Sequence, residues 1–120
     1  MRMQIWSEGV ILVELPDEPE TSKALESVIR RVLHRDDCDV VVDFRRVTIV
    51  TSRSLAPLLV LRELLRYHGK RLLLCSLSCS AKDVFSVTAL DGVFEFRNDK
   101  DNALAALGVS SNSPTAPGII

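Results

Sequence analysis

The stretch DVVVDFRRVTIVTSRSL, residues 39–55, decides the fold of this chain. Its three consecutive valines at 40–42 show no polar alternation, which is typical of a strand buried on both faces of a parallel sheet. After a second apolar patch at 47–50, the hydroxyl-bearing residues Thr51, Ser52 and Ser54 precede a leucine-rich segment with helical spacing. The stretch therefore predicts a buried strand, a connecting loop and the start of a helix.

The neighbouring segments extend this unit into a larger α/β pattern. Residues 3–7 and 10–15, separated by Glu8-Gly9, predict a β-hairpin, and apolar residues at helical spacing from 25 to 33 predict a helix capped by Thr21 or Ser22. Downstream we expect a helix ending at 69, a buried strand at 71–76, a helix over about 78–88, a strand at 93–96 and a helix at 103–107. The predicted fold class is α/β, with a mixed β-sheet of the N-terminal hairpin plus parallel strands and with helices packed on it.

Length and composition limit the possible architectures and partners. The 120 residues suit one domain, which we place at 1–108, and a Ser- and Pro-containing stretch at 109–120 predicts a flexible C-terminal tail. A net charge of -1 and 5% aromatic residues argue against nucleic acid as a partner. The apolar stretches are too short for membrane insertion. Three cysteines and a start without a signal core predict a cytoplasmic location.

Catalytic and metal-binding patterns are missing from the sequence. His34 and His68 fall at predicted helix ends, where a cation suits the helix dipole, and the glycines form no phosphate-binding loop. The pairs of His34 with Cys38 and of Cys75 with Cys79 fall at opposite ends of the predicted sheet, about 15–20 Å apart, which is too far for one zinc ion. We therefore expect no catalytic residue, no cofactor and no metal site, and not an enzyme.

The hydroxyl residues of the predicted strand-to-helix loop form the candidate site. A helix N-terminus favours negative charge, so Thr51, Ser52 and Ser54 lie where a phosphate would be stabilised, although serine and threonine also act there as simple caps. Pro57 favours a helix that starts at Ser54, because proline lacks an N–H and loses no hydrogen bond only near a helix start. This start would leave Ser52 in the loop.

Arginines flank the same loop in the sequence. Arg45, Arg46 and Arg53 are suited to pair with a phosphoserine, since a guanidinium binds phosphate through two parallel hydrogen bonds. The alternative interpretation is a set of solvated surface charges, which contribute little energy.

The order of elements and the loop together resemble the STAS domain of bacterial anti-sigma-factor antagonists. Val40 to Phe44 match the family's strand ending in Asp and an apolar residue, 47–50 match its hydrophobic patch, and Thr51 to Leu55 match its Asp-Ser-Ser-Gly-Leu signature. The resemblance spans about residues 3–107. Thr51, Arg53 and Ser54 depart from the signature, which has Asp, Ser and Gly at these positions.

The resemblance implies a regulator that binds a protein partner, an anti-sigma factor that is also a serine protein kinase of the ATPase fold. It implies phosphorylation at Ser52, with Thr51 and Ser54 as less favoured positions. The predicted partner-binding residues are Arg45, Arg46, Thr51, Ser52, Arg53, Ser54 and Leu55. The alternative function is a non-switching STAS subunit that partners an ABC-type transporter ATPase.

Overall fold

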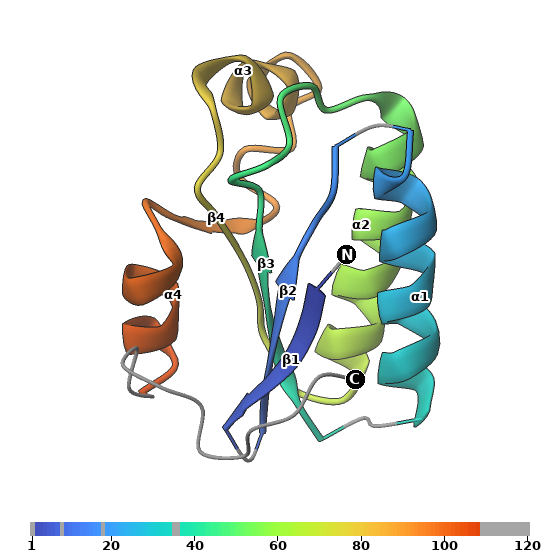
Figure 1. Ribbon diagram of the computed structural model, residues 1–120, viewed down its shortest axis with the longest axis vertical. Helices are drawn as coiled ribbons and strands as arrows, with labels where there is room; N and C mark the ends of the chain where they lie inside the picture. Colours follow the sequence, from blue (N-terminus) through green and yellow to red (C-terminus); the bar gives the residue numbers. More distant parts are fainter. Residues whose placement is uncertain (1, 8, 18, 35–36, 109–120) are drawn as a thin grey trace.

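The computed structural model describes residues 2–7, 9–17, 19–34 and 37–108 (Figure 1). They form five strands and four helices. In chain order these are β1 (Arg2–Ser7), β2 (Val10–Glu14), α1 (Thr21–His34), β3 (Asp39–Asp43), α2 (Ser52–Tyr67), β4 (Leu72–Cys75), α3 (Cys79–Val87), β5 (Glu95–Arg97) and α4 (Lys100–Ala106). The predicted α/β class is confirmed. The predicted tail at 109–120 lies outside the described residues.

The sheet has the order β1-β2-β3-β4-β5, so strands adjacent in the chain are also adjacent in space. β1 pairs with β2 antiparallel, as the predicted hairpin requires, and the remaining pairs are parallel. Val42 of β3 is level with Val13 of β2 and with Leu74 of β4. The carboxyl ends of β2, β3 and β4 therefore meet at one edge of the sheet, where the loops to α1, α2 and α3 begin.

β3 supplies both hydrophobic cores through its alternating side chains. Val40 and Val42 belong to the larger core, and Val41 between them belongs to the smaller one. Helices α1 and α2 lie side by side on one face of the sheet, and α4 covers the other face with Ala103 and Leu104 (Figure 1). The interpretation of the valine run as a strand buried on both faces is thus confirmed.

The start of α2 differs from the prediction. The helix begins at Ser52, with Thr51 as its N-cap, and not at Ser54. The backbone N–H groups of Ser54 and Leu55 donate to the Thr51 carbonyl oxygen at 3.0 and 3.2 Å. Pro57 therefore lies inside the helix, and the Arg53 carbonyl lacks the hydrogen bond that residue 57 would otherwise donate.

Burial explains why the earlier start is preferred. The Ser54 side chain is fully buried, and Leu55 is 8% exposed and packs in the larger core. Both side chains point inward because the helical turn already includes these two residues. The free energy gained by burying them outweighs the single hydrogen bond lost at Pro57. Within the described ranges, no helix has the length and apolar character needed to cross a membrane.

Candidate functional site at the start of helix α2

The candidate site lies where the loops after β2, β3 and β4 converge. Residues 44–51 connect β3 to α2, Asp17 lies in the connection from β2 to α1, and Ser78 to Ser80 lead from β4 into α3. Contacts among these three connections fix the shape of the loop that precedes Ser52. This edge of a parallel sheet is where α/β proteins commonly bind their ligands.

Asp43 organises the first turn of the loop. The residue is only 5% exposed, and its Oδ1 accepts a hydrogen bond from the Arg45 backbone N–H at 2.9 Å. The Val47 N–H donates to the Phe44 carbonyl oxygen at 2.9 Å, which closes a tight turn with Arg45 and Arg46 exposed at its tip. The strand-ending Asp of the sequence therefore holds the turn that presents the two arginines.

Cys75 lies next to Asp43 on the adjacent strand. Its buried thiol contacts the Val42 carbonyl oxygen at 3.6 Å. Burial, with a smaller contribution from the Asp43 carboxylate, raises the pKa of the Cys75 thiol to about 12. Cys75 is therefore a protonated core residue at neutral pH, which makes it a poor nucleophile or metal ligand.

Asp17 ties the loop to the connection between β2 and α1. Its Oδ2 accepts a hydrogen bond from the Thr48 hydroxyl at 2.6 Å, and its Oδ1 accepts one from the Thr48 N–H at 3.1 Å. On the other side, the Ser80 hydroxyl donates to the Thr48 carbonyl oxygen at 3.3 Å. Thr48 is thus held by both neighbouring connections, although no local sequence pattern marks Thr48 or Asp17 as a site residue.

A hollow of about 390 Å³ opens at this point of the surface. Its lining residues are Asp17, Thr48, Ile49, Thr51, Ser52 and Arg53. Thr51 makes no side-chain cap for α2, and its Oγ1 is buried without a hydrogen-bond partner among the described residues. The positive end of α2 therefore lacks the usual hydroxyl cap beside the hollow.

The predicted site residues differ in accessibility. Ser52, the first residue of α2, and Arg53 are exposed, and Thr51 is half-buried. Ser54 and Leu55 are buried, so their side chains pack inside the molecule and do not form a contact surface. The structure thus brings Ser52 and Arg53 together at the hollow and leaves Arg45 and Arg46 at the exposed turn after β3.

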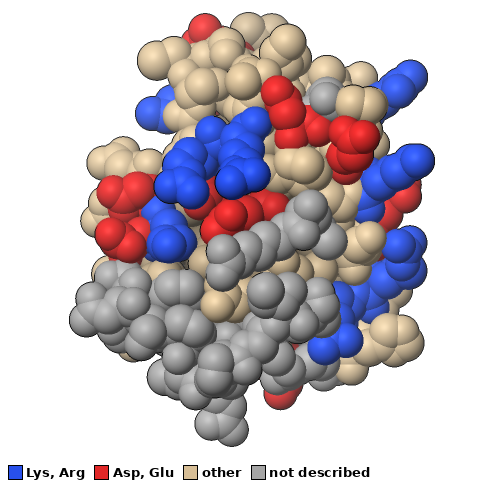
Figure 2. All heavy atoms as spheres, viewed as in Figure 1, with Lys and Arg blue, Asp and Glu red and all other residues tan. Residues whose placement is uncertain are grey.

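The charges on the surface are mixed. On the face seen in Figure 2, a group of Lys and Arg side chains lies directly beside acidic side chains. Such an arrangement produces no broad field of one sign, in keeping with the net charge of -1. Electrostatic attraction of a partner to this face therefore depends on individual charged groups.

The chain belongs to the STAS domain family. The family model for the STAS domain matches residues 19–103, which include α1, the loop from β3 to α2 with Ser52, and part of α4, whereas Asp17 lies just before the matched range. The resemblance seen in the sequence is thereby confirmed. The fold is the α/β fold of anti-sigma-factor antagonists, and the chain shares it at low sequence identity.

Solved structures of such antagonists are similar over nearly the whole chain. An anti-sigma-factor antagonist (STAS) domain protein from Planctomyces limnophilus has a TM-score of 0.76 at 20% identity, covering 89% of this chain and 98% of that one. The antagonist SpoIIAA in its unphosphorylated form has a TM-score of 0.71 at 13% identity, covering 91% and 97%. The Bacillus cell fate determinant SpoIIAA in its phosphorylated form has a TM-score of 0.60 at 16% identity, covering 89% and 99%.

Proposed function

We propose that this chain is an anti-sigma-factor-antagonist-like regulator that binds a protein partner through the surface around Ser52 and is switched by phosphorylation of Ser52. The partner is an anti-sigma factor that is also a serine kinase of the ATPase fold. One observation carries the proposal. Ser52 is an exposed hydroxyl at the start of α2, in a hollow that Asp17, Thr51 and Arg53 also line.

Accessibility selects Ser52 from the three hydroxyl residues. A kinase must reach the oxygen that it modifies, and Ser54 is fully buried while the Thr51 oxygen is shielded from solvent. Ser52 is exposed. We therefore place the modification at Ser52 alone and leave Thr51 and Ser54 out of the proposal.

The local charges give the phosphate a defined effect. A phosphoserine adds about -1.5 to -2 charges at neutral pH, which the N-terminus of α2 and the Arg53 guanidinium would stabilise. The Asp17 carboxylate, which lines the same hollow, would repel it. The charged residues that line the hollow are one aspartate and one arginine, so the phosphate would make the hollow clearly negative.

The proposed effect on the partner is loss of binding. A partner that contacts the exposed Ser52 hydroxyl and the hollow would meet a larger, negatively charged phosphate group after phosphorylation. The phosphate would occupy the hollow, and it would repel acidic groups of the partner. Arg45, Arg46 and Arg53 are the exposed cations nearest in sequence to this surface. They are the groups that an acidic region of the partner would contact first.

The test uses the full chain, ATP and the candidate kinase from the same genome. Mass spectrometry should find the phosphate on Ser52, and Ser52→Asp should weaken partner binding at least tenfold while Ser52→Ala binds like the wild type. Ser86→Asp is the matched control, because Ser86 is exposed on α3 and the same charge there should leave binding unchanged. Absence of phosphate from Ser52 together with equal binding of Ser52→Asp would refute the switch.

The same experiment separates the alternative function. A non-switching STAS subunit of an ABC-type transporter would co-purify with a transporter ATPase. Ser52→Ala would leave this co-purification unchanged, and no phosphate would be found on Ser52 of the wild type. The exposed Ser52 surface would then be a fixed contact. Genes adjacent to this one, for an anti-sigma kinase or for a permease, provide an independent comparison.

A further inference from the structure

The outward face of α2 carries an apolar groove far along the helix from Ser52. The groove has a volume of about 720 Å³, and its lining residues within the described part of the chain come from α2: Leu59, Val60, Glu63, Leu64, Arg66 and Tyr67. Val60 is 50% exposed and Tyr67 is 86% exposed. Large apolar side chains this exposed on adjoining turns of one helix are typical of an interaction surface.

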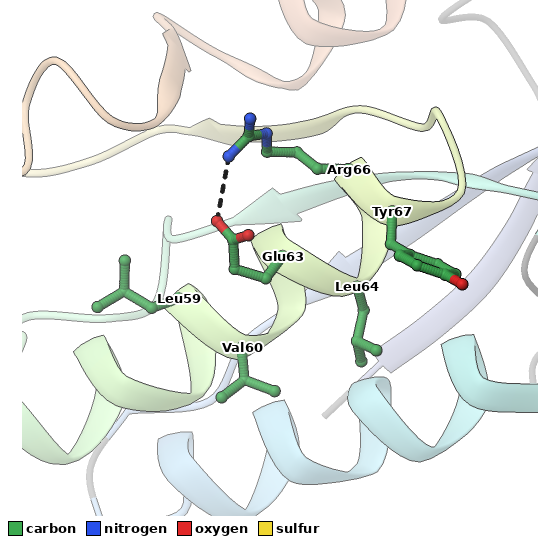
Figure 3. A pocket seen from close by; sticks show the side chains of 6 residues that line it. All are labelled: Leu59, Val60, Glu63, Leu64, Arg66 and Tyr67. Atoms are coloured by element: carbon green, nitrogen blue, oxygen red, sulfur yellow. Dashed lines mark hydrogen bonds and ion pairs between the residues drawn. The ribbon is translucent and has the colours of Figure 1, made fainter.

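These residues divide into an apolar row and a charged row. Val60, Leu64 and Tyr67 follow the spacing of three and four residues that aligns side chains along a helix, and in Figure 3 they project from the same side of α2. Glu63 and Arg66 project from the adjoining side, with a distance of 3.3 Å between the Glu63 carboxylate and the Arg66 guanidinium. The groove therefore has an apolar row beside an ion pair.

We propose that this face binds the same face of a second copy of the chain, with the two α2 helices antiparallel. A two-fold axis beside Leu64 would place Val60 of each copy opposite Tyr67 of the other. The same axis would place Glu63 of each copy opposite Arg66 of the other. The midpoint of the Val60–Tyr67 pair and the midpoint of the Glu63–Arg66 pair lie about one residue apart along the helix, which is about 1.5 Å. Side chains of this length can adjust to such an offset.

Self-complementarity is the reason for choosing a second copy as the occupant. A two-fold interface requires one patch to match itself, so each group must lie opposite a group that suits it. In the antiparallel arrangement the apolar row meets the apolar row and the charged row meets the charged row with opposite signs. A parallel two-fold arrangement would instead place the apolar row of each copy against the charged row of the other.

The groove involves a single helix from each copy, so the buried area is small. Interfaces of this size form weak, concentration-dependent dimers. Sedimentation velocity with the full chain, from about 10 µM to about 1 mM, should show a reversible monomer–dimer equilibrium. Tyr67→Asp should weaken dimerisation at least about tenfold, because aromatic residues dominate interface energies. Val87→Asp is the control, since Val87 is as exposed as Tyr67 but lies on α3.

Charge reversal and cross-linking test the antiparallel register. Glu63→Arg alone and Arg66→Glu alone should each weaken the dimer, and the two combined in one chain should restore it. In a Cys79→Ser background, chains carrying Val60→Cys and chains carrying Tyr67→Cys should form the mixed disulfide faster than either forms its own. Circular dichroism confirms that each variant is folded.

Two results would overturn the proposal. One is a monomer at every concentration, including the case in which another protein covers the groove. The other is a dimer that is insensitive to Tyr67→Asp or to the charge reversals. Neither result bears on phosphorylation at Ser52, because the groove and the proposed function rest on different residues of α2.

Discussion

Removing the Asp17 carboxylate is expected to loosen the loop before α2 and to destabilise the chain measurably. Asp17→Ala breaks the hydrogen bonds to the Thr48 hydroxyl at 2.6 Å and to the Thr48 N–H at 3.1 Å. A hydrogen bond contributes about 0.5–1.5 kcal/mol net, and these two are solvent-exposed, so we expect a loss of about 1–2 kcal/mol in the free energy of unfolding. Urea denaturation followed by circular dichroism measures this difference.

A double-mutant cycle isolates the contact from other effects of the substitution. Thr48→Val removes the hydroxyl and keeps the backbone N–H, so its coupling energy with Asp17→Ala should be about 0.5–1 kcal/mol. Asp83→Ala, on the exposed surface of α3, is the control and should cost less than about 0.5 kcal/mol. Additive effects of Asp17→Ala and Thr48→Val, without coupling, would refute the view that Asp17 fixes this loop.

Three further predictions concern the core, the pH dependence and the thiols. Leu74→Ala should cost about 2–5 kcal/mol in urea denaturation because Leu74 is fully buried, whereas Leu33→Ala, at a site 60% exposed, should cost less than about 1 kcal/mol. The hydrogen bond from Arg71 lowers the pKa of Glu95 below 4.5, so the stability from this pair is complete above that pH and declines as the pH falls through the lowered pKa. Denaturation across this pH range should therefore show a smaller acid loss in Glu95→Gln than in the wild type. In the native chain, a thiol reagent at pH 8 should modify only Cys79, since the other two thiols are buried, and all three should react in denaturant.

The periodicity of the sequence was sufficient to predict the elements and their order. The uninterrupted valines identified β3 as a strand with two buried faces, and the hairpin residues identified the antiparallel pair β1 and β2. The predicted start of α2 at Ser54 is wrong because the hydrogen bond lost at Pro57 is not the largest contribution there. The burial of Ser54 and Leu55, which decides the start, depends on packing that no local pattern contains.

The candidate site was predicted only in part. The hydroxyls and arginines of residues 45–54 were visible as a local cluster, and the structure places them in and beside one loop. Asp17 was missed because its contact with Thr48 joins residues 31 positions apart, although its position after a parallel strand was a usable signal. The groove on α2 was not predicted because its residues fit the spacing of an ordinary leucine-rich amphipathic helix, and that spacing does not show which of the apolar side chains stay exposed.

The proline inside α2 has a consequence for how the first turn of the helix moves. Because Pro57 donates no hydrogen bond to Arg53, the turn that begins at Ser52 is joined to the rest of the helix by one bond fewer than usual. Local opening of this turn therefore costs less than opening a turn of an uninterrupted helix, and its amide hydrogens should exchange faster than those near Leu61. Because Ser54 and Leu55 are buried, such opening is expected to be confined to the exposed residues Ser52 and Arg53.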